Sequence, residues 1–293
     1  SYVKRIDFLF ALDKGVVTHL GSRIGATTVV LGDAKKLGAE KEQSNVEHFV
    51  DVPFGQFAQD LGSPLYTSTV AVAVALGMLG VSRHFLDEYL TKRFAKKGED
   101  VVAKNLEAAT KGHAFGLHIA YDQGFEVHLV QDKAVAAEMM LSGNDALGLG
   151  ALAAGCNYVS SYPMSPGTGL FTFLANAGKE FGVVIDQAED EIAAINQVLG
   201  AWYAGARGLV TTSGGGFSLM CEGVSLAGMI ETPLVVHVGM RPGPATGLPT
   251  RTEQADLDLV LYAGHGEFPR VIFAPGSHQE AFEYMQAAFA LAD

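Results

Sequence analysis

The chain has 293 residues, 48% of them hydrophobic, which is enough for one large or two ordinary domains with substantial cores. Its formal net charge of -12 argues against a nucleic-acid partner, because binding to a phosphate backbone requires clustered lysine and arginine. Cys156 and Cys221 have no metal-ligand spacing and fit small buried residues of a reducing compartment. We find no signal-peptide pattern and no apolar run long enough for a membrane span, so we expect a cytoplasmic protein.

The first predicted elements alternate between strands and helices. Apolar runs over Ile6 to Leu12 and Ala26 to Leu31 predict buried strands, and a short strand is expected over Val50 to Pro53. Helices are expected in three later stretches: Ser68 to Leu79, Arg83 to Lys96 and Asp100 to Thr110. These elements predict an α/β domain over residues 1–120.

A linker is expected next, because the stretch from His113 to Val130 shows few helical signals and some strand character. We place the linker at residues 121–135 and a second domain at residues 136–293. In that domain, Asn144 is predicted to cap a helix that runs to Ala154, since its side chain can accept hydrogen bonds from free N–H groups.

Four successive segments between Asn157 and Glu253 share one pattern: a β-branched run, a turn of Ser, Thr, Gly or Pro, then a helical pattern. They are NYVSSYPMSPGTG, VVIDQAEDEIAAI, GLVTTSGGGFSLM and LVVHVGMRPGPATGLPTRTEQ. Strands alternating with helices predict a parallel sheet covered on both faces, and ligands bind such sheets at the carboxyl ends of the strands. We therefore expect the functional site at these four turns. A helix over Glu253 to Ala263, a strand over Arg270 to Ala274 and a final helix capped by Ser277 complete the predicted domain.

The first two turns each have a structural explanation beside a functional one. Ser165 followed by Pro166 fits an N-cap and first helical residue, although a helix start also presents backbone donors to an anion. Glu191 lies in a first helical turn, where acids interact favourably with the helix dipole. The sequence after Glu191 is almost wholly apolar, and a carboxylate buried there is costly without a partner. If Glu191 points inward, it must bind something.

The last two turns leave alternatives open as well. The turn from Ser213 to Gly216 can cradle a phosphate or allow a helix to pack closely on a strand; it matches neither GxGxxG nor a P-loop. Arg241 follows an apolar strand, where it can bind a carboxylate or form a salt bridge to Glu222 or Glu231. His237 is predicted to be a core histidine, and no histidine spacing indicates a metal site.

The segments YPMSP, EDEIAAI, TTSGGGFSLM and ETPLVVHVGMRPGPATGLPTRTEQADL, in this order, resemble the pyrimidine-binding domain of thiamine-diphosphate enzymes. More narrowly, they resemble the alpha subunit of the 2-oxoacid:ferredoxin oxidoreductases, and GLPTRTEQADL is most similar to the 2-oxoglutarate branch. Residues 1–120 resemble the smaller gamma domain of that family. The resemblance implies an α/β fold in which a gamma-type domain precedes a parallel-sheet, thiamine-diphosphate-binding domain.

The resemblance also implies which residues contact the cofactor. A glutamate at the position of Glu191 hydrogen-bonds the aminopyrimidine ring of thiamine diphosphate in this family, which makes Glu191 the expected catalytic residue. Pro163 and Ser165 match positions that line the cofactor and substrate pocket, and Ser213 is placed with them as a cofactor-binding residue.

For the substrate, the resemblance implies a 2-oxoacid that is decarboxylated with coenzyme A as co-substrate. Ser165 and Arg241 match substrate-binding positions, with Arg241 on the 2-oxoacid carboxylate, and we add Arg251 as a hypothesis for the distal carboxylate of 2-oxoglutarate. The expected reaction converts 2-oxoglutarate and coenzyme A to succinyl-CoA and CO₂, or runs in reverse as in the reductive TCA cycle. Pyruvate or another 2-oxoacid is the alternative substrate.

Partner subunits are implied because two motifs are missing from the sequence. There is no GDG with a downstream Asn for Mg²⁺ and the diphosphate, and no cysteine cluster for an iron–sulfur centre. We therefore expect Mg²⁺ and a [4Fe-4S] cluster in a beta subunit that shares the thiamine diphosphate, in a dimer of heterodimers that reduces ferredoxin.

Two other functions are weighed against this one. A nucleotide-dependent doubly wound oxidoreductase would use the turn from Ser213 to Gly216, but the sequence lacks GxGxxG and a following ribose-binding acid. A non-catalytic assembly subunit would keep the fold without the activity, and the presence of Glu191 at the expected place argues against it.

Overall fold

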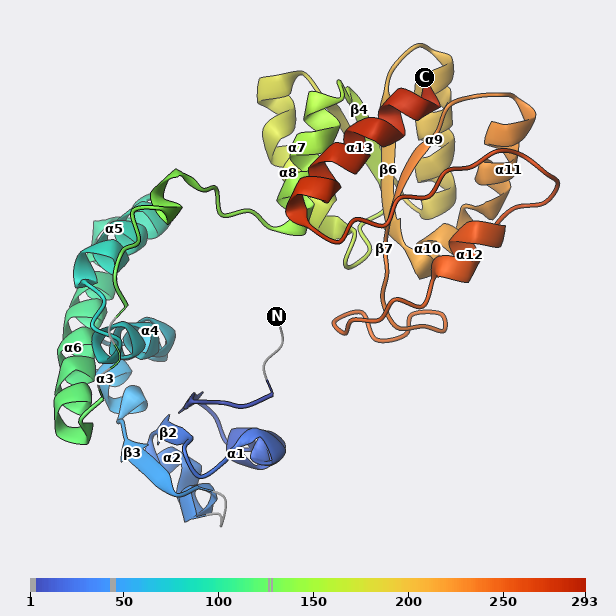
Figure 1. Cartoon of the computed structure of the whole chain (residues 1–293). Coiled ribbons are helices and arrows are strands. Elements are labelled where there is room, and N and C mark those ends of the chain that lie inside the picture. Colours follow the sequence, from blue (N-terminus) through green and yellow to red (C-terminus); the bar gives the residue numbers. More distant parts are fainter. Residues whose placement is uncertain (1–3, 43–45, 126, 128) are drawn as a thin grey trace. The chain divides into compact units, whose positions relative to one another are not determined.

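A computed structural model describes residues 4–42, 46–125, 127 and 129–293 (Figure 1). The chain divides into two compact units, Ser1–Ala137 and Glu138–Asp293, called here the N-terminal and C-terminal units. Each unit is built around its own parallel sheet, of three and four strands respectively. The predicted α/β class is confirmed.

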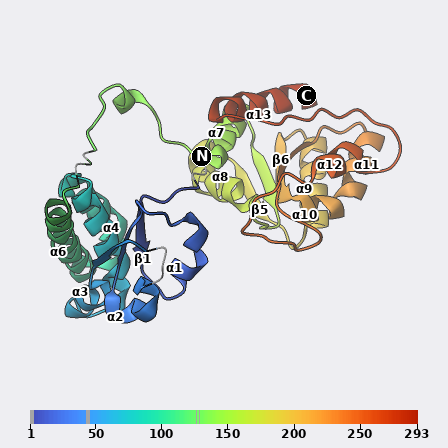
Figure 2. The same cartoon turned by 60° about the horizontal axis from the view of Figure 1, so that its bottom comes forward.

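The N-terminal unit has a parallel sheet of order β1-β2-β3, with strands β1 (Phe8–Ala11), β2 (Val29–Gly32) and β3 (His48–Asp51). Its short helices are α1 (Val16–His19), α2 (Ala34–Leu37) and α3 (Phe54–Asp60), and its long helices are α4 (Thr67–Met78), α5 (Arg83–Phe94) and α6 (Glu99–Gln123). Apolar side chains alternate along β1 and β2, so α1 and α2 cover one face and α4 and α6 lie on the other (Figure 2). The three predicted strands form, although the third begins two residues earlier than expected and ends at Asp51 instead of Pro53.

The prediction that helical structure ends near Thr110 was wrong, because α6 continues to Gln123 and covers residues 121–123 of the expected linker. Glycines weaken helical signals in a sequence, but here they allow α4 and α6 to pack closely. A Cβ at Gly112 would lie 2.7 Å from the Val70 carbonyl oxygen, and one at Gly116 would overlap the Val74 carbonyl oxygen. Tertiary packing therefore overrides local propensity in this helix.

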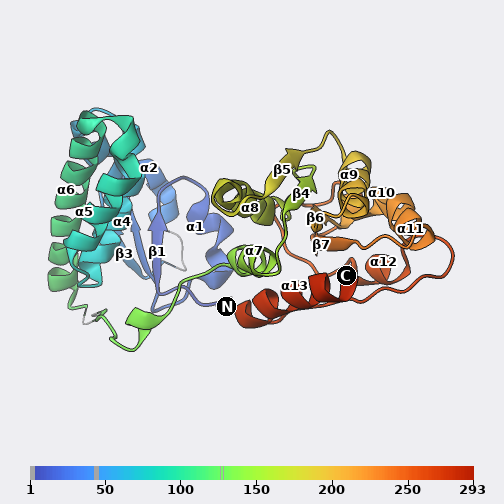
Figure 3. The same ribbon diagram turned by 90° about the horizontal axis from the view of Figure 1, so that it is seen from above.

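The C-terminal unit is a parallel sheet of order β5-β4-β6-β7, formed by β4 (Tyr158–Ser161), β5 (Val184–Gln187), β6 (Gly208–Ser213) and β7 (Val235–Gly239). Each strand comes from one of the four segments singled out in the sequence. Its helices are α7 (Gly143–Ala153), α8 (Thr168–Phe181), α9 (Glu191–Tyr203), α10 (Gly214–Leu219), α11 (Cys221–Met229), α12 (Leu257–Tyr262) and α13 (His278–Ala292). Helices α7, α8 and α13 cover one face and α9 and α11 the other (Figure 3). The core between them includes Leu170, Ile195 and Leu209, all fully buried.

Three local predictions in this unit have different outcomes. Ser277 does cap α13, because its side chain accepts from the Glu280 N–H at 3.1 Å. Helix α7 is capped by Ser142 in a capping box with Asp145, not by Asn144, since a residue already inside the helix cannot be its N-cap.

The strand expected over Arg270 to Ala274 does not form. Pro269 and Pro275 flank this stretch and cannot donate ladder hydrogen bonds. The Arg270 guanidinium instead donates to the carbonyls of Val260 and Ala263 at 2.7 and 2.6 Å. The preceding helix is also shorter than expected, because α12 begins only at Leu257. None of the helices in the described ranges is both long and apolar enough to cross a membrane.

Candidate functional site

The turns after β4, β6 and β7 meet at one edge of the C-terminal sheet, because β6 pairs with both other strands. One contact joins the turn after β4 to the turn after β7: Arg241 Nη1 donates to the carbonyl oxygen of Ser165 at 2.7 Å. Thr211 and Ser213 of β6 lie between them and are fully buried. The sheet order therefore gathers polar groups from separate segments into one place, as predicted for strand ends of a parallel sheet.

Glu191 is the first residue of α9 and points inward, with only 3% of its surface exposed. The preceding residue, Asp190, acts as the cap and accepts from the Ala193 N–H at 2.7 Å, so Glu191 is free of that task. The Oε1 atom of Glu191 is buried and has no hydrogen-bond partner in the structure. Burial raises the pKa of the Glu191 carboxyl above its usual 4.5; the negative charge of Asp190 adds to this, and the positive charge of Arg241 opposes it.

Arg241 is 7% exposed and its Nε also lacks a hydrogen-bond partner. No ion pair joins Arg241 to Glu222 or Glu231 in the described ranges, so the salt-bridge alternative is not realised. The buried guanidinium of Arg241 donates from one nitrogen to a carbonyl, and a second nitrogen is unpaired. It therefore retains donors for an anionic ligand.

A cavity of about 470 Å³ opens beside Arg241. Its walls are Met164 from the turn after β4, residues 214, 215, 218 and 219 of α10, residues 241–246 of the loop after β7, and Asp256 with Leu259. The loop is braced by its own backbone, because Leu248 N donates to the Pro242 carbonyl at 3.2 Å and Gly247 N to the Pro244 carbonyl at 3.0 Å. The volume lies within the range of small-molecule sites.

Asp256 was not among the predicted site residues. Its carboxyl group lies directly against Gly214, where a Cβ would overlap it, and its Oδ2 is buried without a partner. Its position before an apolar helical run is typical of a helix cap, and that explanation hides it in the sequence. In the structure the Asp256 side chain makes no cap hydrogen bond to α12.

The other predicted residues are placed as follows. Ser165 is not an N-cap: α8 begins at Thr168 without a side-chain cap, and the Ser165 carbonyl is held by Arg241. Ser213 has a fully buried hydroxyl that lacks a hydrogen-bond partner. Pro163 is partly exposed in the turn after β4, and Arg251 is exposed on the loop after β7. Of the predicted site residues, Arg241 lines the cavity, whereas Pro163, Ser165, Glu191, Ser213 and Arg251 do not.

His237, predicted to be a core residue, is only partly buried in β7, and its ring contacts Thr211 of the neighbouring strand. Its Nδ1 lies 2.8 Å from the Thr211 hydroxyl, which is 3.2 Å from the Gly167 carbonyl oxygen. Desolvation lowers the pKa of His237 to about 4, so the ring is neutral near pH 7. No group of three or more potential metal ligands occurs within the described ranges.

Two family models match the chain. The model for pyruvate flavodoxin/ferredoxin oxidoreductase, thiamine diphosphate-binding, matches residues 149–293, and the model for pyruvate ferredoxin/flavodoxin oxidoreductase matches residues 1–115. The C-terminal unit is thus a thiamine-diphosphate-binding domain of the oxidoreductase type. The chain belongs to the 2-oxoacid:ferredoxin oxidoreductase family, in which it corresponds to the alpha subunit.

Curated relatives agree with this assignment. The chain is 37% identical over 228 residues to the 2-oxoacid:ferredoxin oxidoreductase subunit alpha of Saccharolobus solfataricus, covering 73% of the chain and 34% of the relative. It is 42% identical over 153 residues to the 2-oxoglutarate synthase subunit KorA of Archaeoglobus fulgidus, covering 52% and 44% respectively. The chain therefore spans less than half the length of these relatives.

A solved structure is similar over nearly the whole chain. It is the 2-oxoglutarate:ferredoxin oxidoreductase from Magnetococcus marinus with 2-oxoglutarate, coenzyme A and succinyl-CoA bound. The TM-score is 0.85 at 33% sequence identity, and the match covers 98% of this chain and 50% of that one.

The polar groups of the site fit thiamine diphosphate. Four buried atoms of the site lack partners: Glu191 Oε1, Ser213 Oγ and Arg241 Nε of the predicted residues, and Asp256 Oδ2. An aminopyrimidine ring offers both a ring nitrogen and an amino group, which can hydrogen-bond a carboxyl and a hydroxyl of this kind. A buried acid with a raised pKa is also suited to exchanging a proton with a ring nitrogen.

Proposed function

We propose that this chain supplies the pyrimidine-binding half of a thiamine-dependent active site that oxidatively decarboxylates 2-oxoglutarate with coenzyme A, or runs the reverse carboxylation. One observation carries the proposal: the Glu191 carboxyl group is buried and has an unpaired oxygen. Such a group is costly unless a ligand completes it. The turn on which it lies belongs to the unit matched by the thiamine-diphosphate-binding family model.

Thiamine diphosphate, when bound, supplies the chemistry that removes CO₂ from a 2-oxoacid. Glu191 hydrogen-bonds the aminopyrimidine ring and holds a proton at its Oε1. Ser213 donates to the same ring system from β6, and the turn at Pro163 and Ser165 lines its edge.

Arg241 binds the carboxylate of the 2-oxoacid. Its guanidinium is already oriented by the Ser165 carbonyl, and it faces the cavity of about 470 Å³. A positive charge with a free donor in a buried site favours an anionic ligand. Arg251, exposed on the loop after β7, is proposed to contact the distal carboxylate, which exists in 2-oxoglutarate and not in pyruvate.

Two relatives support 2-oxoglutarate over other 2-oxoacids: the KorA subunit of Archaeoglobus fulgidus is named a 2-oxoglutarate synthase subunit, and the Magnetococcus marinus structure contains 2-oxoglutarate. The same structure contains coenzyme A and succinyl-CoA, which supports the co-substrate. We further propose a beta subunit that carries Mg²⁺ and the [4Fe-4S] cluster, ferredoxin as electron acceptor, and a dimer of heterodimers.

The nucleotide-dependent alternative has no comparable support. A phosphate-binding glycine turn needs open space above its backbone. Here the space above Gly214 and Gly216 is filled by the side chains of Asp256 and Glu191. A non-catalytic assembly subunit is also disfavoured, because such a protein has no reason to retain a buried, unpaired acid.

The proposal is tested with Glu191→Gln in the complex reconstituted with its partner subunit. The substitution keeps the size of the side chain and removes the titratable carboxyl. We expect 2-oxoglutarate-dependent reduction of a viologen to fall by at least about a hundredfold at saturating thiamine diphosphate, with assembly intact. Glu189→Gln, which removes an exposed acid two residues upstream, is the matched control. Unchanged turnover in Glu191→Gln would refute the proposal.

A further inference from the structure

The glycine turn at residues 214–216 has a feature that neither sequence explanation foresaw. A Cβ at Gly216 would overlap the Thr212 hydroxyl oxygen and would lie 2.7 Å from both Cγ and Oε1 of Glu191. Real Cβ atoms do not approach other heavy atoms this closely. The volume that a side chain at Gly216 would occupy is therefore the volume in which the Glu191 carboxyl sits.

The absence of a side chain at Gly216 is not required by the backbone. Gly216 lies within α10 and its φ is outside the left-handed region, so any L-residue can adopt this conformation. Alanine favours a helix interior over glycine by about 1 kcal/mol. Local helix propensity thus disfavours glycine at this position, and the contact with Glu191 and Thr212 is what requires it.

We infer that Gly216 is a positioning residue for Glu191: the missing Cβ leaves free the space in which the buried carboxyl and its unpaired oxygen lie. This rests on the proposed role of Glu191 and extends it. Glu191 is the first residue of α9, Thr212 lies near the end of β6 and Gly216 lies in α10, so three elements meet at this point. Any side chain at 216 displaces the carboxyl or opens the turn.

The first test is Gly216→Ala in the reconstituted complex, with Gly200→Ala as the matched control. Gly200 is on α9, the same helix as Glu191, and a Cβ there meets nothing within 4 Å. We expect Gly216→Ala to lower kcat about a hundredfold, because displacement of a catalytic group by about 1 Å has costs of that order. Gly200→Ala should retain wild-type activity and gain slightly in thermal stability.

A second variant separates the two collisions. Thr212→Ala removes the hydroxyl that a Cβ at 216 would overlap, so Thr212→Ala/Gly216→Ala retains only the collision with Glu191. If Gly216 positions Glu191, the kcat of the double variant stays at least tenfold below that of Thr212→Ala. The melting temperatures of these two variants should be similar. Recovery of activity to the level of Thr212→Ala would show that the glycine only clears the hydroxyl, and would overturn the inference.

A measurement without cofactor or turnover completes the test. The carboxyl stretching band of Glu191 can be assigned by infrared difference against Glu191→Gln and followed with pH in the complex free of thiamine diphosphate. We expect its titration midpoint to move in Gly216→Ala and in the double variant, and to stay in Gly200→Ala. An unmoved midpoint, with Glu191→Gln inactive, would refute the role of Gly216 alone; active Glu191→Gln would refute the proposed function itself.

Discussion

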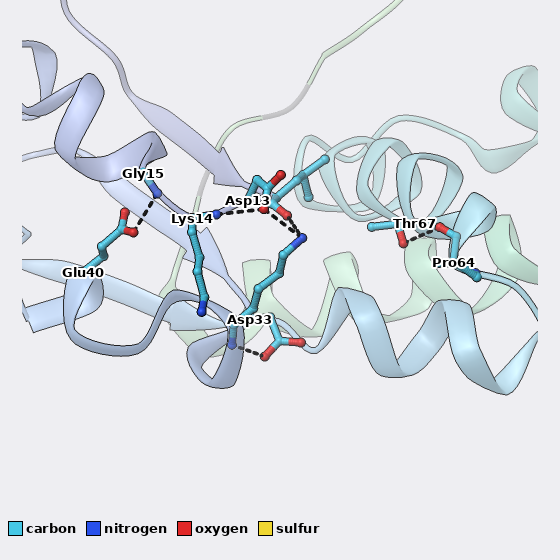
Figure 4. Close-up of polar contacts among 9 residues, drawn as sticks. Asp13, Lys14, Gly15, Asp33, Glu40, Pro64 and Thr67 are labelled. Carbon is cyan, nitrogen blue, oxygen red and sulfur yellow. Dashed lines mark hydrogen bonds and ion pairs between the residues drawn. The ribbon is translucent and has the colours of Figure 1, made fainter.

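In the N-terminal unit, the acidic side chains at the carboxyl ends of the strands accept from backbone N–H groups or pair with a lysine. After β1, Asp13 accepts from Lys14 N at 3.0 Å and pairs with Lys36 at 3.2 Å. After β2, Asp33 caps α2, and Glu40 accepts from Gly15 N at 2.6 Å (Figure 4). One oxygen of Glu40 is buried without a partner, but the other is well bonded.

In the C-terminal unit, the corresponding edge leaves its polar groups unpaired. Glu191, Ser213 and Arg241 each have a buried atom without a hydrogen bond, and all three residues are more than nine-tenths buried. Both units have parallel sheets with acids and glycines at the strand ends, so sequence pattern alone does not separate them. The difference is that a paired, solvated acid stabilises a turn, whereas an unpaired buried one is costly unless a ligand completes it, which is the role proposed for Glu191.

The largest expected effect comes from removing the cation at the strand ends of each unit, Arg241 in the C-terminal unit and Lys36 in the N-terminal unit, and comparing the KM for the 2-oxoacid. Arg241→Met should raise the KM for the 2-oxoacid about a hundredfold, because losing a buried, charge-assisted contact costs about 3 kcal/mol. Lys36→Met removes the cation at the equivalent edge of the N-terminal unit, where it bonds the Leu12 carbonyl and Asp13, and should leave KM unchanged. Steady-state kinetics of both variants make the comparison.

Melting temperatures should accompany these kinetics, because Arg241 also holds the Ser165 carbonyl. Arg241→Lys keeps the charge but not the planar fork, so its KM should fall between wild type and Arg241→Met. Equal KM values for wild type and Arg241→Met would mean that the buried guanidinium is a structural tie between two turns, and the contrast between the edges would lose its functional meaning.

Much of this architecture could be predicted because its signals are local. Strands β4 to β7 appear in the sequence as short β-branched runs followed by turns, β1 and β2 appear as apolar runs, and Glu191 is conspicuous as an acid before an apolar helix. The sequence left open whether Glu191 points inward; helical geometry and the cost of a buried charge predicted only that an inward-pointing carboxylate needs a partner.

Other features depend on contacts between distant segments. Helix α6 passes through Gly112 and Gly116 because α4 packs against them, and no local pattern carries that information. The roles of Ser165, Asp256 and Gly216 follow from neighbours that are far away in the chain, namely Arg241, Gly214 and Glu191. The direct tie between Ser165 and Arg241 depended on the order of the strands, which the sequence pattern does not determine.

A smaller effect is expected on substrate choice. Arg251→Ala should raise the KM for 2-oxoglutarate about fivefold and leave that for pyruvate unchanged, because an exposed ion pair contributes about 1 kcal/mol. Lys179→Ala, which removes an exposed cation near the end of α8, should affect neither substrate. An equal rise for both substrates would exclude Arg251 as the group that recognises the distal carboxylate.

The smallest effect concerns stability and pH, and it measures how strongly the C-terminal edge disfavours the charge of Glu191. In the folded state the pKa of Glu191 is raised above 4.5, chiefly by burial. The unfolded chain therefore releases this proton first as the pH rises. The contribution of Glu191 to stability is fully present below pH 4.5 and is lost as the pH rises through the raised folded-state pKa. The free energy of unfolding of the wild type should thus fall relative to Glu191→Gln across this window and then level off.

Urea unfolding of the chain without cofactor, at several pH values, measures this difference directly. Other groups that titrate in the same window, such as His237 with its pKa of about 4, are present in both proteins and cancel in the subtraction. Glu189→Gln should run parallel to the wild type, since its side chain is exposed. If the free energy of unfolding of Glu191→Gln has the same pH dependence as that of the wild type, the Glu191 carboxyl is as well solvated or as well paired as the acids at the strand ends of the N-terminal unit. The two edges would then differ in sequence but not in physical character, and the unpaired oxygen could no longer be taken as the mark of a ligand site.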